Sequence, residues 1–202
     1  MKKFITFIPR QPEGALKEVN YIAEDNPALA YDQLTRFPIV PAIHGYAKPG
    51  EAIQVISVLE QYNYSMNNMK YFRAEMDRLR TEFGLNIQLT VLEVPYSDGV
   101  ETQLETFQKL TEQIDDGDDL FICITYASKV VPIIQTMVVR YASLAKKDVL
   151  LRCAVYGQFD HEEHVSKIYD VTPLFRMDDI LQALAKAGVK DIGKAISAII
   201  RL

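Results

Sequence analysis

Short apolar runs alternate along this chain with stretches whose apolar residues recur every three or four positions. The short runs have the length and β-branched composition of buried strands, whereas the spaced residues form one face of a helix. When a strand is followed by a helix and then by another strand, the two strands of that βαβ unit are parallel. The pattern therefore predicts an α/β chain with a Rossmann-like three-layer fold, in which helices flank a mostly parallel central sheet.

Five strands and three helices can be placed from this pattern. We expect strands at residues 4–8, 52–59, 85–94, 120–124 and 149–156, and helices at 69–83, 100–114 and 131–145. The run 120–124 is the most hydrophobic of these strands, which predicts a place at the centre of the sheet. Between residues 15 and 50, prolines interrupt short mixed segments, and no element is predicted there.

For two of the helices, the sequence also predicts which residues face the core or a partner. The helix at 100–114 begins with Asp98 and Glu101, which resemble a capping box. Its buried face is predicted from the helical spacing of its apolar residues, which are Val100, Leu104, Phe107, Leu110 and Ile114. The helix after Lys129 has apolar residues on more than one side, and we expect Met137 or Val138 to face a second copy of the chain.

The length of 202 residues favours one domain with a small extension. We expect residues 1–174 to form the Rossmann-like domain and residues 175–202 to form a C-terminal helical extension. In that extension Ile180, Leu181 and Leu184 follow a helical spacing that ends at Gly188.

Charge and cysteine content narrow the range of partners and compartments. The chain has 22 Lys and Arg against 27 Asp and Glu, so its formal net charge is −5, which argues against non-specific attraction to duplex DNA or to an anionic membrane. No apolar run approaches the length of about 18 residues that a membrane span needs. Cys123 and Cys153 lie in apolar strand-like runs, where reduced buried thiols are common. We therefore expect a cytoplasmic protein.

Three loops are candidates for ligand binding, because ligands of open parallel sheets bind beyond the carboxyl ends of the strands. The first contains Pro9, Arg10 and Gln11, the second contains Ser97, Asp98 and Gly99, and the third runs from Thr125 to Lys129. The third loop precedes a helix with Pro132 in its first turn, and a helix N-terminus favours an anion. Composition alone supports equally well that Ser128 is only a helix cap and Lys129 a solvated surface charge.

Several familiar catalytic and cofactor motifs do not occur in the sequence. It has no Gly-rich dinucleotide fingerprint, no Walker Gly-Lys-Ser or Gly-Lys-Thr, and no Gly-x-Ser-x-Gly elbow. His161 and His164 are three positions apart, whereas the zinc-protease motif places them four apart, so we expect neither a metal nor a cofactor. No catalytic residue is assigned.

Three segments resemble the CARF (CRISPR-associated Rossmann fold) domain family. The segment from Asp119 to Pro132 (DLFICITYASKVVP) resembles its strand-loop-helix signature, the segment from Val94 to Gly99 (VPYSDG) resembles its third loop, and the segment from Lys167 to Phe175 (KIYDVTPLF) resembles its closing strand. Family members often carry Thr-His-Gly followed by a large residue and Arg, whereas Tyr126 and Lys129 occupy the corresponding places here. Lysine keeps the charge of arginine but lacks its bidentate fork.

The resemblance implies a ligand, an assembly and a set of binding residues. The ligand would be a cyclic oligoadenylate, expected to be cyclic tetra-adenylate, bound across the two-fold axis of a homodimer in type III CRISPR defence. The dimer would signal to an effector domain or partner protein outside this chain. The implied contacts are Pro9, Arg10, Gln11, Ser97, Asp98, Gly99, Thr125, Tyr126, Ala127, Ser128, Lys129 and Pro132. Two alternatives stay open: a ring nuclease that cleaves the messenger, and a binding domain for another anionic metabolite.

Overall fold

The computed structural model describes residues 1–126, 128–160 and 165–200. The elements follow one another as β1 (Lys2–Phe7), β2 (Tyr21–Ala23), the 3-10 helix η1 (Pro27–Leu29), α1 (Ile39–Tyr46), β3 (Ala52–Glu60), α2 (Asn63–Glu82), β4 (Asn86–Val94), α3 (Val100–Thr111), β5 (Asp119–Cys123), α4 (Val131–Ala145), β6 (Leu150–Asp160), β7 (Val165–Asp170), α5 (Thr172–Lys186) and α6 (Ile192–Ile200). The five predicted strands and three predicted helices all occur, with boundaries that differ by a few residues. In the described ranges, no helix is long and apolar enough to cross a membrane.

One seven-stranded sheet organises the molecule, in the order β2-β7-β6-β5-β1-β3-β4. The five strands from β6 to β4 are parallel, β7 runs antiparallel to β6, and β2 is parallel to β7. The predicted α/β class with a mostly parallel sheet is thereby confirmed. The hydrophobic β5 is the fourth of the seven strands, which is the central place that its composition predicted.

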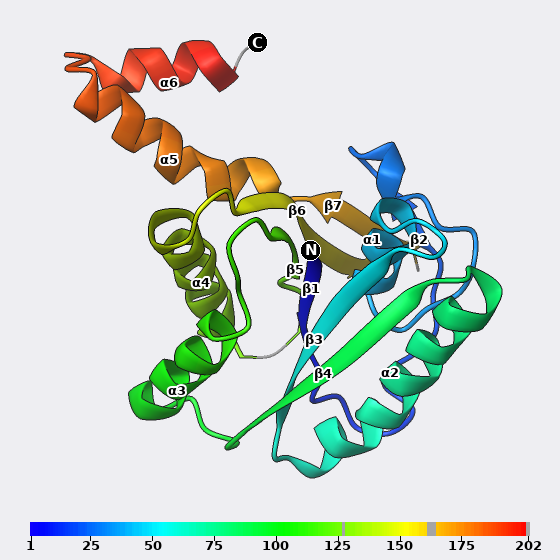
Figure 1. Ribbon diagram of the computed structural model, residues 1–202. Coiled ribbons are helices and arrows are strands. Elements are labelled where there is room, and N and C mark those ends of the chain that lie inside the picture. The colour runs from blue at the N-terminus through cyan, green and yellow to red at the C-terminus, as the bar shows by residue number, and fades with distance from the viewer. Residues whose placement is uncertain (127, 161–164, 201–202) are drawn as a thin grey trace.

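Helices cover both faces of the sheet and enclose two apolar cores (Figure 1). On one face, α1 and α2 pack on alternate side chains of the central strands, among them Phe4, Val55 and Phe121. On the other face, α3 and α4 pack on the intervening side chains, among them Ile5 and Ile122. Because β1, β3 and β5 are buried on both faces, apolar residues point to both sides of each strand, so their sequences do not show a strict alternation of apolar and polar residues.

The helix α3 is rotated relative to the prediction. Val100 and Leu104 are 74% and 54% exposed, whereas Gln103 and Thr106 are buried. Both buried donors have local acceptors, since Gln103 Nε2 donates to the carbonyl of Ser97 at 3.0 Å and the Thr106 hydroxyl donates to the carbonyl of Thr102. The predicted buried face is therefore wrong for its first two residues, because the spacing of apolar residues does not reveal which polar residues find partners.

The predicted capping box at the start of α3 is also wrong. The residue that caps the helix is Gly99, and among the described residues no side chain makes a capping hydrogen bond there. Instead, Ser97 Oγ accepts a hydrogen bond from the Gly99 amide at 3.0 Å, which forms a tight turn before the helix. Asp98 turns toward the guanidinium of Arg10.

The C-terminal helices α5 and α6 form an arm that projects from the domain (Figure 1). We call residues 172–200 the arm. The helix α5 begins at Thr172, so the expected boundary after residue 174 falls within its first turn. The segment compared above with a closing strand is accordingly β7 as far as Asp170 and helix from Thr172 onward.

Candidate functional site

The sheet has a topological switch point at β1. From β1 the chain passes through α1 to β3 on one side, and after β4 it passes through α3 to β5 on the other side of β1. The two crossovers leave a crevice between the carboxyl ends of β1 and β5, which is where α/β sheets of this kind bind ligands. The loop that follows Phe7 and the loop that follows Cys123 therefore meet at this point.

A cavity of about 630 Å³ opens beside this crevice. We call it the switch-point cavity, and its size is within the range of ligand pockets in general. Its lining comes from five segments of the chain and consists of Gln11, Ala15, Leu16, Lys17, Val19, Tyr21, Thr125, Tyr126, Gly157, Phe159 and Ser166. Of the predicted binding residues, Gln11, Thr125 and Tyr126 are among them.

Two tyrosines form a polar wall of the cavity. The Tyr126 hydroxyl donates to the carbonyl of Arg36 at 2.6 Å, and its side chain interacts with that of Tyr21. Burial raises the pKa of Tyr21 to about 12 and raises the pKa of Tyr126 well above its usual value of 10. Both side chains are therefore neutral phenols at physiological pH, and this wall offers aromatic faces and hydroxyls without a negative charge.

A hydrogen bond to Thr125 links the loop after β5 to β6. Thr125 Oγ1 accepts a hydrogen bond from the amide of Gly157 at 2.8 Å and faces the thiol of Cys123 at 3.3 Å. Gly157 has no room for a side chain, because a Cβ there would lie 2.4 Å from Cγ of Pro38 and 3.1 Å from a ring carbon of Tyr21. The close approach of Pro38 holds β6 against the wall and shapes the cavity.

The first loop contributes a polar atom that has no partner. Asn68 holds this loop through hydrogen bonds from its Nδ2 to the carbonyls of Pro9 at 3.0 Å and Gln11 at 2.9 Å. The side-chain Oε1 of Gln11 is buried and, among the described residues, accepts no hydrogen bond. A buried acceptor without a donor is unfavourable, so a ligand that donates a hydrogen bond here gains free energy.

Arg10 lies elsewhere, in a cluster beyond the ends of β3 and β4. Its guanidinium makes a bidentate ion pair with Glu60, which is only 2% exposed, and a longer contact of 3.4 Å with Asp98. The ring of Tyr96 covers the guanidinium at 4.7 Å and stacks in turn on Tyr62. The hydrogen bond to Glu60 raises the pKa of Arg10 further. Arg10 is thus paired with Asp98. The lining of the switch-point cavity includes neither Arg10 nor the second-loop residues Ser97, Asp98 and Gly99.

The remaining predicted residues lie between the cavity and α4. The helix α4 begins at Val131, with Pro132 in its first turn, and the Val131 amide donates to the carbonyl of Ser128 at 3.1 Å. No side chain caps this helix, and the Ser128 hydroxyl is buried with no hydrogen-bond partner in the part of the chain that the structure describes, so Ser128 is not a side-chain cap. Lys129 is exposed. Ala127 lies outside the described residues, as do His161 and His164.

Several residues of the cavity are not among those predicted from the sequence. Tyr21 and Lys17 lie in the stretch for which no element was predicted, and Phe159 and Ser166 follow the predicted end of the last strand. Gly157 carried a usable signal, because an isolated glycine within a strand often marks a close approach of another segment.

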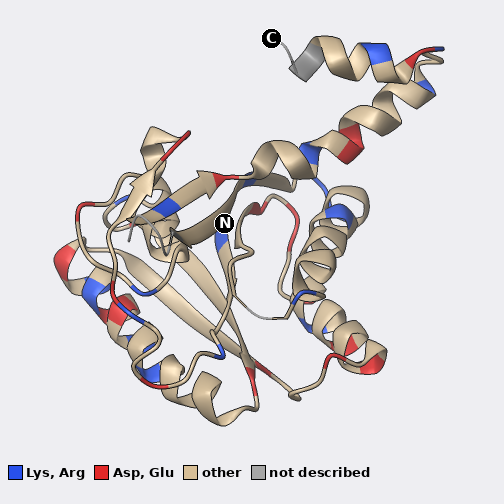
Figure 2. Ribbon diagram, turned by 180° about the vertical axis from the view of Figure 1, so that it is seen from behind, with Lys and Arg blue, Asp and Glu red and all other residues tan. Residues whose placement is uncertain are grey.

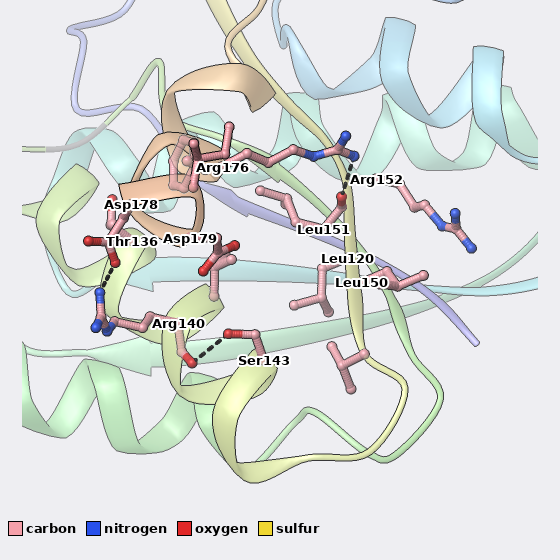
Figure 3. A pocket seen from close by; sticks show the side chains of 14 residues that line it. Leu120, Thr136, Arg140, Ser143, Leu150, Leu151, Arg152, Arg176, Asp178 and Asp179 are labelled. Atoms are coloured by element: carbon pink, nitrogen blue, oxygen red, sulfur yellow. Dashed lines mark hydrogen bonds and ion pairs between the residues drawn. The ribbon is translucent and has the colours of Figure 1, made fainter. Parts of the chain in front are cut away.

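A second cavity, of about 500 Å³, lies between α4, α5 and the start of β6 (Figure 3). Its floor is apolar and includes Leu120 and Leu151, and the ion pair between Arg140 and Asp178 joins its two helical walls. We call it the arm-base cavity. Its three arginines are engaged, since Arg140 pairs with Asp178, Arg152 pairs with Asp119, and Arg176 donates to the carbonyl of Leu151. The switch-point cavity is therefore the stronger candidate for a ligand.

An apolar surface lies beside these sites on the outer side of α3 and α4. Phe107 of α3 meets Tyr141 of α4, with ring centroids 5.8 Å apart, so Leu104 and Met137 lie level one turn earlier on the two helices. We call the exposed large apolar residues of this surface the apolar strip: Val100, Leu104, Ile133, Met137, Tyr141 and Leu144. Met137 is 43% exposed and Val138 is buried, so Met137 is the outward-facing member of the predicted pair.

No protein-family model matches the chain, and no curated protein matches it significantly. The fold and the cavity define the class directly: an α/β domain with an open cavity beside the switch point of a mostly parallel sheet.

Proposed function

We propose that this chain is a CARF-type sensor that binds a cyclic oligoadenylate and acts as a homodimer. The observation that carries the proposal is the open switch-point cavity, whose aromatic and hydroxyl lining continues through Thr125 and Tyr126 into the exposed cation Lys129. Of the three sequence segments that resemble the CARF family, the segment from Asp119 to Pro132 contains these residues.

The lining suits the chemistry of an adenylate. Aromatic side chains such as Phe159 and Tyr126 offer surfaces for an adenine ring, because stacking on aromatic side chains is a common mode of base recognition. The unpartnered Oε1 of Gln11 can accept a hydrogen bond from an exocyclic amine. Lys17 at the cavity and Lys129 in the next loop supply positive charge for phosphates.

Assembly into a dimer accounts for the apolar strip. It also explains how a chain with a net charge of −5 could bind a ring of phosphates. Burial of a strip of this kind against a second copy removes its apolar surface from water. In a two-fold dimer each loop is used twice, so a ring of phosphates would meet two copies of Lys129. Signalling to an effector then passes through a partner protein or a domain outside this chain.

Isothermal titration of the full chain with cyclic tetra-adenylate and cyclic hexa-adenylate tests the proposal. We expect binding of one ring per dimer, with the dimer measured independently by light scattering. The absence of heat with both rings and with other cyclic nucleotides would overturn the proposed ligand. A ligand-competent monomer at micromolar concentration would overturn the shared site but leave the ligand in place.

The same samples separate sensing from ring cleavage. Cleavage requires a ribose 2′-hydroxyl in line with its phosphate and stabilisation of the developing charge. Chromatography of the ring after incubation shows intact ligand for a sensor and linear adenylates for a ring nuclease. Mass spectrometry of ligand that co-purifies with the chain tests the third interpretation, an unrelated anionic metabolite.

A further inference from the structure

The arm exposes apolar residues that no other described part of the chain covers. Along α5 only Thr172 is buried, whereas Leu174 and Leu181 are 70% and 39% exposed. Leu174, Met177, Leu181 and Leu184 recur at spacings of three and four, and they form what we call the arm stripe. Two short helices with so little buried surface gain little stability from each other, because helices of this length depend on tertiary packing.

The base of the arm lies on the same side of the sheet as the apolar strip. Val171 and Phe175 pack against the core formed by α3 and α4, and the ion pair between Asp178 and Arg140 joins α5 to α4. From this base the arm extends outward beyond α4 rather than back over the sheet (Figure 1). A two-fold axis that passes beside the apolar strip and runs roughly along the strands would place the arms of both copies at the same end of the dimer.

The charges of the arm fit a second copy of itself. Arg176, Lys186, Lys190 and Lys194 are interspersed with Asp178, Asp179 and Asp191, so both signs occur along its length (Figure 2). A two-fold axis brings one surface against an identical surface, which requires a surface that is complementary to itself. A strongly acidic or strongly basic arm would repel its copy, whereas this mixed arm can place opposite charges across the axis.

We propose that the arms of two copies pack against each other through their arm stripes, as a four-helix cluster that clasps the dimer at the end of the molecule remote from the switch-point cavity. This inference rests on the proposed homodimer, and it adds a second contact that does not involve the ligand. The arrangement buries Leu174 and Leu181 of both copies and gives α5 and α6 the packing that they lack in a single chain.

Cross-linking of an introduced cysteine tests this contact in the full chain. The two native cysteines are buried and free, so a thiol cross-linker should act mainly on the introduced residue. We choose Leu181→Cys in the arm stripe, with Leu174→Cys as a second position, and a short bis-maleimide as the cross-linker. Met66→Cys is the matched control, because Met66 is 56% exposed on α2, the helix on the opposite face of the sheet.

We expect most of the Leu181→Cys or Leu174→Cys protein to migrate at twice the chain mass after treatment, and the Met66→Cys protein to stay at the mass of one chain. A companion variant, Leu181→Asp, should raise the dissociation constant of the dimer at least tenfold. A dimer in which neither arm position cross-links more than the control would overturn the arm contact and leave the proposed homodimer standing. A monomeric wild-type chain would overturn both.

Discussion

Beyond the carboxyl ends of β3 and β4, which we call the closed side, the charged groups pair with one another. Beyond the ends of β5 and β6, which we call the open side, polar groups remain available to a ligand. On the first side the Arg10 guanidinium is held by Glu60, Asp98 and the ring of Tyr96. On the second side Gln11 keeps an unpartnered acceptor, and the switch-point cavity is open. A position at the carboxyl edge therefore does not by itself make a residue a ligand contact, because neighbouring residues can already pair with its polar groups.

The largest expected effect is on the closed side. Replacement of Arg10 by Ala leaves the buried Glu60 carboxylate unpaired, and a broken buried ion pair costs about 3–5 kcal/mol. We expect a fall of that size in the free energy of unfolding, measured by urea denaturation. The control is Lys194→Ala, which breaks an exposed pair with Asp191 and should change stability by less than about 1 kcal/mol. An Arg10→Ala protein of native stability that no longer binds the ring would move Arg10 to the ligand site.

The second effect concerns the tyrosine wall of the open side. The pKa of Tyr21 is raised to about 12, so the folded chain keeps a proton that the unfolded chain loses near pH 10. Stability is therefore complete below pH 10 and falls as the pH rises toward 12, by about 2–3 kcal/mol at about 1.4 kcal/mol per unit.

Urea denaturation at several pH values between 8 and 11.5 measures this loss. Tyr21→Phe should reduce the decline, whereas Tyr64→Phe, at an exposed tyrosine, should retain it. Equal declines in the two variants would show that Tyr21 does not keep its proton in the folded chain.

The third effect separates the two sides by ligand affinity. Lys129 is exposed, so Lys129→Ala should leave folding unchanged and weaken binding of cyclic tetra-adenylate by about 1.5–3 kcal/mol, the range for a hydrogen bond to a charged group. Isothermal titration measures the change, and Lys70→Ala on α2 is the matched control because Lys70 is also exposed. An unchanged dissociation constant would remove Lys129 from the site.

The smallest effect is expected at Thr125. Its Oγ1 is already engaged by the Gly157 amide, so Thr125→Val leaves a buried N–H without a partner and costs about 1–2 kcal/mol of stability. Thr125→Ser keeps the acceptor and should lose less. Thermal unfolding of the two variants measures the difference, and equal stability would show that the hydrogen bond to Gly157 contributes little.

The order of strands and helices was predictable because hydrophobic periodicity is a local property of the chain. The run at 120–124 even indicated its own central place, since a strand without polar residues must be covered on both faces. The same local signal failed on α3, where Gln103 and Thr106 are buried in place of Val100 and Leu104. Gln103 Nε2 finds an acceptor in the Ser97 carbonyl outside the helix, and periodicity does not report such a contact.

The sequence by itself determined the α/β class, the loops at the carboxyl edge and the outward excess of apolar residues on α4. Only the tertiary structure decided which loop residues stay available to a ligand and which are paired with other residues of the chain. Arg10 and Glu60 are fifty positions apart and become partners because β1 and β3 are neighbours in the sheet. The switch-point cavity likewise joins Gln11, Tyr126 and Gly157 from separate segments. Local sequence sets the propensity of each segment, whereas a site depends on distances between segments, which exist only once the strands have paired.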